Sequence, residues 1–438
     1  MEVRGIITRL RERGAFHIVE LTAELLRLCR GRGAELRASR IDPRWATTFR
    51  QLRRGVADVV RDRGQLDGED AHRLAGLVAG HGAASPPDVL VARAIAEGLD
   101  DGAGQFFADW FYGQELDLEP GDPFPVADSK MRSWVPSSTG APSVRTEPLD
   151  RLPRLRLAPS DLRGLRVSMR WADAQLAELE HVERFGIGIP CGPDVFETFT
   201  WQRYSIDAQH LFFHVRPRDE AWLEANVRTV LELAARRGVG LLVLPELCLT
   251  EAMYARLVSS RAFCAVPFVV PGSHHAPSGV GPGHNETGLL VRGKPIVAHR
   301  KFRPVLFPDR LDDDGNRRDV TRQEHLAVDE SRLSICVSGD WSVATLICKD
   351  VMDNAVQDLL RDLAVQLVLV PAMSPKVEDF ADLAQQLGRD PQGVTLVANV
   401  GETVAVVGVP AVKNRVISVP HGAGSLWVFD RAGQIVIE

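Results

Sequence analysis

The sequence has little lysine, no closely paired cysteines and no long apolar run. Of its 52 basic residues, 46 are Arg and only six are Lys. No stretch approaches the roughly 18 consecutive apolar residues that a membrane-spanning helix needs, and the N-terminal segment MEVRGIITRLRERGAF lacks the apolar core of a signal peptide. The six cysteines include no CxxC pair. Scattered cysteines in a long chain without a signal predict free thiols, and therefore a cytoplasmic protein.

An excess of basic charge is also missing. The 438 residues carry 52 basic and 58 acidic side chains, which gives a net charge of −6. General binders of nucleic acids or anionic membranes need a basic surface, so the sequence argues against both partners. Hydrophobic residues make up 45% of the chain, enough for a sizeable core. The length suggests about two or three domains.

The first 208 residues divide into a helical part and an irregular part. Within residues 1–116, apolar residues recur at three- and four-residue spacing, for example in ITRLRERGAFHIVELTAELLRLCR. This spacing predicts a mostly α-helical module, in which we find no catalytic set. Residues 117–208 are rich in Pro, Ser and charge, and we expect a linker and an irregular region there.

Short apolar strands alternate with helices over residues 209–438. We expect strands at LFFHVRP, GLLVLPEL, WSVATLICKD, QLVLVPAM and VTLVANV, and an amphipathic helix at DEAWLEANVRTVLELAARRG. TGLLVRGKPIVAHRK and GSLWVFDRAGQIVIE have the form of hairpins. Strands separated by helices, with antiparallel pairs among them, predict an α/β layered fold.

Three side chains with complementary chemistry follow three of these strands. Cys348 lies where VATLI ends and a helix soon begins, a turn that exposes a nucleophile beside backbone N–H groups. A thiol with an ordinary pKa of about 8.5 needs a neighbouring base or cation. Glu246 follows the strand LLVL and is the candidate base, because catalytic groups often stand at the carboxyl ends of core strands. Lys301 follows PIVAHR and is the candidate for stabilising an oxyanion.

The order of Glu246, Lys301 and Cys348 resembles the nitrilase superfamily of carbon–nitrogen hydrolases, over roughly residues 209–438. The blocks that carry the resemblance are EANVRTVLELAARRGVGLLVLPELCLTE, HNETGLLVRGKPIVAHRKFRP, VATLICKDVMDN, LVLVPAM, VTLVANVGE and HGAGSLWVFDRAGQIV, in the family's order. The resemblance implies a four-layer α-β-β-α sandwich, here preceded by the helical module. It also implies hydrolysis of a non-peptide C–N bond through a thioester, with no metal and no cofactor.

The resemblance gives each site residue a role. Glu246 would be the general base, Lys301 would stabilise the tetrahedral intermediate, and Cys348 would form the thioester. The backbone N–H of Lys349 would be a second oxyanion donor. Glu324, 24 residues before Cys348, is the candidate for a second glutamate that orients the lysine. Lys349 stands where nitrile hydrolysers usually carry tryptophan, which favours a small amide-like substrate over a nitrile.

Other interpretations stay open on the sequence alone. The helical module is a candidate partner-binding domain, which would make the chain a regulated effector of a bacterial defence or conflict system. A catalytically inactive binding module is a third alternative. The chain ends after GQIVIE, where many family members continue into a tail exchanged across a dimer, so the resemblance leaves a homo-oligomer open. His274, His275 and His284 share a Gly-rich loop, but no thiol or carboxylate stands there at a metal-binding spacing.

Overall fold

The computed structural model of the chain divides into two compact units. Among the described residues, the first unit holds those up to Leu162 and the short segment Val337–Asp340, and the second holds the others from Arg163 on. No helix among the described residues is both long and apolar enough to cross a lipid bilayer. The structure describes residues 2–79, 86–104, 106–127, 152–192, 194–205, 211–276, 282–311, 317–328, 330–374, 377–389, 393–400, 403–408, 415–418 and 422–437.

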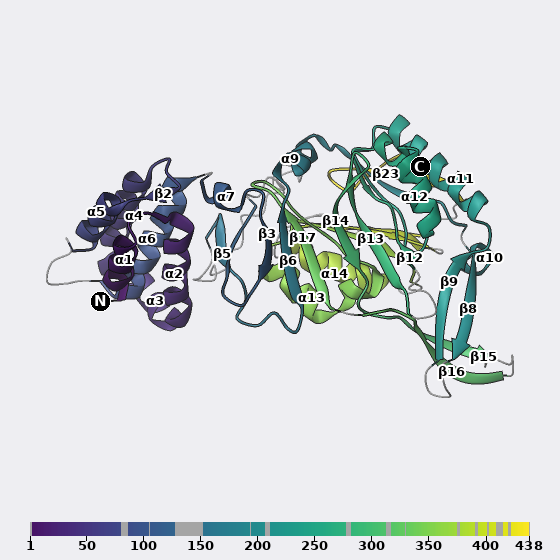
Figure 1. Ribbon diagram of the computed structural model, residues 1–438, viewed down its shortest axis with the longest axis horizontal. Helices are drawn as coiled ribbons and strands as arrows, with labels where there is room; N and C mark the ends of the chain where they lie inside the picture. The colour runs from purple at the N-terminus through teal and green to yellow at the C-terminus, as the bar shows by residue number, and fades with distance from the viewer. Residues whose placement is uncertain are drawn as a thin grey trace. The chain divides into compact units, whose positions relative to one another are not determined.

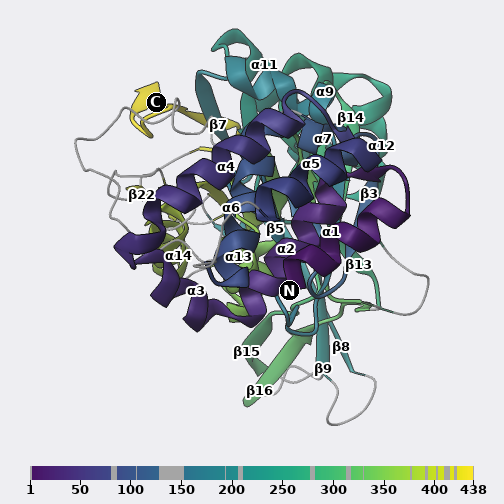
Figure 2. The same ribbon diagram turned by 90° about the vertical axis from the view of Figure 1, so that its left-hand side faces the viewer.

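The first unit is mainly helical, which confirms the prediction for residues 1–116. Figure 2 shows its helices gathered into one bundle. The helices are α1 (Glu2–Glu12), α2 (Ile18–Gly31), α3 (Gly33–Arg40), α4 (Ala46–Val60), α5 (Gly68–Ala79), α6 (Asp88–Ala103) and α7 (Phe106–Phe111), with a 3-10 turn at Pro43–Trp45. The strands are β1 (Phe16–His17), β2 (Gln65–Leu66), β3 (Glu115–Leu118), β4 (Pro123–Pro125) and β5 (Leu155–Leu157).

Helix α6 is the centre of this bundle. It is buried along most of its length because α2 and α4 pack against it. Gly98 lets α4 approach closely, since a Cβ atom there would lie 2.6 Å from the backbone oxygen of Arg53. The buried Arg93 is paired with Glu97, at 2.8 Å between Nε and Oε1. A close ion pair offsets part of the free-energy cost of burying a guanidinium group. At least one arginine of this unit is therefore part of its interior.

The second unit contains two large sheets, each with parallel strands at its centre. The first sheet has the order β12-β13-β11-β10-β7-β23-β24, with β14 paired to β13, and its parallel strands are β7, β10 and β11. Its strands are β7 (Arg184–Ile189), β10 (Leu241–Val243), β11 (Phe268–Val270), β12 (His274–Ala276), β13 (His284–Val291), β14 (Lys294–Arg300), β23 (Ser425–Asp430) and β24 (Ile435–Ile437).

In the second sheet, the strands that belong to this unit follow the order β22-β21-β20-β19-β18-β17-β6, and β18, β19 and β20 are parallel. Parallel strands end at the same edge of a sheet, so both sheets gather strand ends where polar side chains can meet. The strands are β6 (Arg166–Trp171), β17 (Arg332–Val337), β18 (Ser342–Thr345), β19 (Leu367–Ala372), β20 (Val394–Asn399), β21 (Thr403–Gly408) and β22 (Arg415–Ser418).

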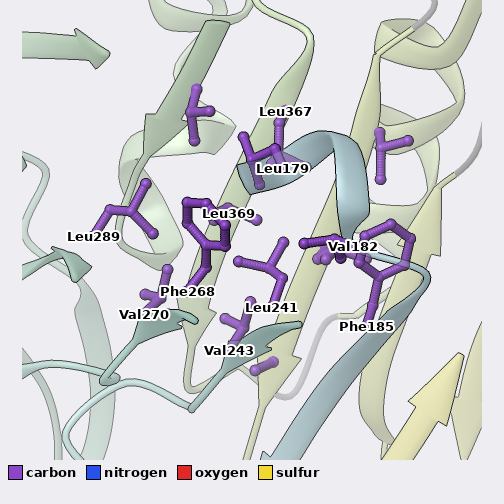
Figure 3. Packing of buried hydrophobic residues seen from close by; sticks show 14 of the residues in the cluster. Leu179, Val182, Phe185, Leu241, Val243, Phe268, Val270, Leu289, Leu367 and Leu369 are labelled. Carbon is purple, nitrogen blue, oxygen red and sulfur yellow. The ribbon is translucent and has the colours of Figure 1, made fainter. Parts of the chain in front are cut away.

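The two sheets pack face to face through a shared hydrophobic core. Figure 3 shows Phe185, Leu241 and Phe268 of the first sheet meeting Leu367 and Leu369 of the second. Successive side chains of a strand point to opposite faces, so the neighbours of these residues face outward. Both faces are covered by protein, which explains why segments such as LLVL and VLVP read as unbroken apolar runs.

Helices cover the outer faces of both sheets. On the first sheet, Val227 and Val230 of α11 (Glu220–Arg236) pack against Leu242 and Leu244, together with α12 (Glu251–Ser259). On the second sheet, α14 (Glu378–Arg389) lies on β20 and β21, beside α13 (Asn354–Asp362). Figure 1 shows the two helix pairs on opposite sides of the sheets. The four-layer α-β-β-α sandwich predicted from the sequence is therefore confirmed.

A smaller four-stranded sheet adds to the sandwich. Its order is β15-β16-β9-β8, and it joins β8 (Phe199–Ser205) and β9 (Leu211–Pro217) to β15 (Leu306–Leu311) and β16 (Arg317–Glu324). The strands β9 and β16 are parallel, and the residues paired between them are Gln323 with Phe212 and Glu324 with Phe213. LFFHVRP is thus a strand as expected, but it belongs to this additional sheet and not to the sandwich.

The predicted start of the sandwich at residue 209 was wrong. The second unit begins at Arg163, and β6 and β7, inside the expected irregular region 117–208, are members of the two large sheets. Strand β7 was hard to recognise because it contains Gly186 and Gly188. A Cβ atom at Gly188 would lie 2.3 Å from Val230 Cγ1, so the glycine makes room for α11. The same segment also holds the short helices α9 (Asp173–Leu176) and α10 (Val195–Thr198).

The turn after β11 gives a first testable prediction. Gly272 has a positive φ of 80°, and a Cβ atom there would lie 2.3 Å from the backbone oxygen of Pro245. We expect Gly272→Ala to lower the free energy of unfolding by about 1–3 kcal/mol more than Gly164→Ala does, measured by urea unfolding. Gly164 is a matched control because it has a φ of 73° but nothing within 4 Å of its Cβ position. Equal losses for the two variants would contradict the close approach at Gly272.

Candidate active site

Glu246 stands directly after β10, in the turn Pro245–Glu246–Leu247. Leu247 has a positive φ of 59°, and its N–H donates to Ser273 Oγ at 3.0 Å. The Glu246 N–H donates to the backbone oxygen of Ala372, at the end of β19 in the other sheet, at 3.3 Å. The carboxylate is therefore fixed between the two sheets, and Glu246 is only 2% exposed.

Lys301 follows β14 and is held at both ends of its side chain. Its backbone N–H donates to the Asn285 carbonyl of the neighbouring strand at 2.8 Å. Its Nζ lies 2.7 Å from Glu246 Oε1 and 2.6 Å from Glu324 Oε2. The side chain is 1% exposed, so its ammonium is a buried cation between two carboxylates.

Cys348 follows β18 and begins a 3-10 turn, Cys348–Met352. It has a positive φ of 44°, an uncommon conformation for a residue with a side chain. Strained backbone of this kind is often found at active sites, where surrounding structure holds it in place. The thiol hydrogen-bonds to the Glu246 carboxylate, and the backbone N–H of Met373 donates to the sulfur. The structure thus brings Glu246, Lys301 and Cys348 together in one buried cluster.

Glu324 joins this cluster from the additional sheet, where it ends β16. One carboxylate oxygen, Oε2, accepts from Lys301 and from the Val305 N–H at 3.2 Å. The other, Oε1, accepts from Asn285 Nδ2 at 3.0 Å and lies 3.3 Å from His275 Nε2. Glu324 therefore lies beside Lys301, as expected for a second glutamate. Each of its two carboxylate oxygens has two hydrogen-bond partners, so all of its acceptor sites are engaged.

Two further residues support this cluster. Asn285, at the start of β13, donates through Nδ2 to Glu246 Oε1 as well, at 3.0 Å. Asp350 is fully buried, and its Oδ1 accepts from the N–H groups of Phe302 and Arg303 at 3.1 and 2.8 Å. The Asp350 Oδ2 lies 2.8 Å from His299 Nε2. Asp350 therefore ties the segment that carries Lys301 to the turn that carries Cys348, and its signal was the Cys-x-Asp spacing.

Lys349 was expected to supply a backbone N–H. It is the second residue of the 3-10 turn, where N–H groups have no partner within the turn. Its side chain is exposed. The three histidines of the Gly-rich loop have other neighbours: His274 stacks on Tyr254, His275 faces Glu324, and His284 Nδ1 lies 3.1 Å from the Ala327 carbonyl. Within the described part of the chain, no group of His, Cys, Asp and Glu is arranged to hold a metal ion.

Burial and mutual charge set the protonation of the cluster. Burial would lower the pKa of Lys301, but the carboxylates of Glu246 and Glu324 hold it well above its ordinary value. Burial would raise the pKa of Glu324, but Lys301 and His275 keep it well below the usual range. Burial raises the pKa of Glu246 despite Lys301. Burial and the Glu246 carboxylate also raise the pKa of the Cys348 thiol.

Two carboxylates of unequal basicity therefore share one ammonium. Glu324 is the permanent anion that balances Lys301, whereas Glu246 is the more basic carboxylate and contacts a thiol. A carboxylate whose pKa is raised toward the working pH suits proton transfer. Chemically, the cluster can move a proton from sulfur to carboxylate next to a fixed positive charge.

Comparison with solved structures finds similar folds in part of the chain. Three of the matching structures are of amidases. A variant of an amidase of the nitrilase superfamily from Nesterenkonia AN1 is 17% identical, over 57% of this chain and 90% of that one, with a TM-score of 0.39. An amidase from Nesterenkonia sp. is also 17% identical, over 58% and 84%, with a TM-score of 0.35. A variant in complex with butyramide is 16% identical, over 58% and 85%, with a TM-score of 0.36.

No family model and no curated relative matches the chain. The first of these amidases is described as a member of the superfamily that the sequence blocks resemble, and its match covers part of this chain. The function proposed below depends on the contacts among this chain's own residues.

The raised pKa of Glu246 predicts an effect on stability. A group whose pKa is higher in the folded than in the unfolded state makes folding less favourable as the pH rises above the unfolded value, here about 4.5. Glutamine does not titrate. We therefore expect the free energy of unfolding of Glu246→Gln, relative to that of the wild type, to increase with pH between about 4.5 and the folded-state pKa of Glu246, by up to about 1.4 kcal/mol per pH unit. Urea unfolding at pH 5, 6, 7 and 8 measures the difference.

The control for this prediction is Glu232→Gln, which removes an exposed carboxylate from the middle of α11. It leaves the buried cluster intact, so its stability relative to the wild type should not follow the Glu246→Gln curve. A Glu246→Gln difference that is constant from pH 5 to pH 8 would contradict a raised pKa at Glu246.

Proposed function

We propose that the second unit hydrolyses a non-peptide C–N bond, of an amide more than of a nitrile, through a thioester on Cys348. The observation that carries the proposal is the contact of one thiol, one basic carboxylate and one ammonium in a single buried cluster. General-base activation of a cysteine beside a cationic donor is the standard requirement for acyl transfer by a thiol.

In the first half-reaction, Glu246 takes the proton of the Cys348 thiol and the sulfur attacks the carbonyl carbon. The carbonyl oxygen becomes negative, and Lys301 Nζ is its nearest cation. Two of the three ammonium hydrogens are committed to Glu246 and Glu324, so one remains to donate to the oxyanion. The N–H of Lys349 is the second donor. Collapse breaks the C–N bond, and the protonated Glu246 gives its proton to the departing amine.

In the second half-reaction, water replaces the amine. Glu246 takes a proton from the water, whose oxygen attacks the thioester carbon. The C–S bond breaks, the acid leaves, and the proton on Glu246 returns to the sulfur. One base thus serves both steps, and neither step needs a metal or cofactor as a reactant.

The charge of the cluster supports this sequence of proton transfers. With an ionised Lys301, Glu246 and Glu324 and a neutral thiol, the cluster carries one net negative charge. Moving the proton from Cys348 to Glu246 transfers that charge to sulfur without creating a new one, and buried sites strongly disfavour new charge. Such a complete donor and acceptor set favours an enzyme over a catalytically inactive binding module.

The proposal is tested with a library of small amides. We expect wild-type protein to release ammonia or an amine and to form an acyl adduct at Cys348, detected by mass spectrometry. Cys348→Ala should lose at least about 10³-fold in kcat/KM and form no adduct. The matched control is Cys336→Ala, which removes another buried thiol, on β17. Full turnover in Cys348→Ala, or equal loss in Cys336→Ala, would refute the assignment.

A further inference from the structure

Asn285 lies at the centre of the buried cluster, although nothing in the reaction requires it as an acid, base or nucleophile. It is 0% exposed, at the start of β13. Its carbonyl accepts the Lys301 N–H at 2.8 Å, and its side-chain Nδ2 lies 3.0 Å from both Glu246 Oε1 and Glu324 Oε1. One residue therefore touches all three ionised members of the cluster.

The Asn285 amide can take only one orientation. Its NH₂ group has two hydrogens, one for each carboxylate. A flipped amide would set its oxygen against two carboxylate oxygens, with no hydrogen between them. The observed orientation leaves Oδ1 buried, with no hydrogen-bond partner among the residues that the structure describes. The donors of this side chain are thus used fully while its acceptor is unused.

Counting donors separates the two glutamates. Glu324 accepts four hydrogen bonds, two at each oxygen, from Lys301, Val305, Asn285 and His275. Glu246 accepts two at Oε1, from Lys301 and Asn285. A carboxylate oxygen offers about two acceptor sites, so Oε1 of Glu246 is saturated and Oε2 is the oxygen left for the thiol.

We propose that Asn285 is a positioning residue that holds Glu246 by Oε1 and so directs the Cys348 proton to Oε2. The inference rests on the function proposed above. The S–H bond breaks, an O–H bond forms at Oε2, and the electron pair stays on sulfur, so the cluster charge is unchanged. Because Asn285 donates to the ionised form of Glu246, it also limits how basic that carboxylate becomes.

If Asn285 had a purely structural role, its replacement would leave the pH at which Glu246 ionises unchanged. Leucine has the same branched arrangement of side-chain heavy atoms as asparagine, although it is larger, and it has no polar atom to leave unpaired. After Asn285→Leu, Glu246 Oε1 keeps Lys301 and Glu324 Oε1 keeps His275 as donors. We therefore expect Asn285→Leu to fold. Its effect should be seen in the ionisation of Glu246, because a donor to the charged form has been removed.

The test measures the rate at which iodoacetamide alkylates Cys348, by mass spectrometry of its peptide, from pH 4 to pH 9. The rate should fall at acid pH where Glu246 becomes protonated. In Asn285→Leu we expect this fall to occur about one pH unit higher, so that the rate below it is about tenfold lower than in the wild type. Glu246→Gln has no base at this position, so its rate should show no plateau above the acid fall and should decrease by about tenfold per pH unit throughout the acid range. Asn226→Leu, on α11 in the outer layer, should match the wild type.

An acid fall in Asn285→Leu at the wild-type pH would overturn the proposal, whether or not turnover is lost. The same holds if Glu246→Gln keeps the wild-type plateau and acid fall, because Glu246 would then not be the base. If Asn285→Leu does not fold, Asn285→Ala provides the same comparison. Alkylation needs no substrate, so a shifted acid fall without amide turnover would reject hydrolysis as the function and still support the role of Asn285.

Discussion

One buried ammonium between two carboxylates organises the second unit of this protein. Lys301 Nζ lies within 2.7 Å of a carboxylate oxygen of Glu246, which follows a strand of the first large sheet, and of Glu324, which belongs to the additional sheet. Taking ions out of water is costly, and only close pairing with further hydrogen bonds offsets that cost. The surrounding strand ends have to meet at the right distances for the fold to tolerate this cluster. Its geometry therefore constrains the fold as well as the chemistry.

The two carboxylates of the cluster are not equivalent. Burial leaves Glu246 with a raised pKa, while Glu324 is held ionised by Lys301 and His275. The asymmetry comes from the number of donors around each carboxylate. Asp350 adds a second, separate tie between the Lys301 and Cys348 segments. The backbone strain at Cys348 and the buried charge at Glu246 are both unfavourable, and neighbouring residues that do not react stabilise them.

The parts of the fold and the site that could be predicted are those set by residues close together in the sequence. Glu246 and Cys348 follow apolar strands covered on both faces, and Lys301 follows the second strand of a hairpin; both patterns can be recognised locally. Glu324 was predicted by its place in the order of residues, but not the sheet that carries it, because β15 and β16 are rich in charge and lack a clear apolar alternation. The pairing of β16 with β9 is a long-range contact.

Other features were hidden for related reasons. Asn285 is a single polar residue at the start of an apolar strand, and its importance arises only from partners 39 residues away on either side. Strand β7 was assigned to an irregular region because its glycines weaken the strand pattern, and the packing that requires Gly188 is with α11. Composition and periodicity describe neighbours in sequence, whereas these contacts join distant segments.

The short ladder between β9 and β16 has a consequence for how the protein opens. Its two residue pairs include Glu324 itself. Local segments of a folded protein can detach at a lower free-energy cost than global unfolding, and a two-pair ladder at the rim of a domain offers little resistance. Detachment of β16 would withdraw one counter-charge from Lys301 while the sandwich stayed folded. The charge balance of the buried cluster therefore depends on local opening of the β15–β16 hairpin, separately from unfolding of the core.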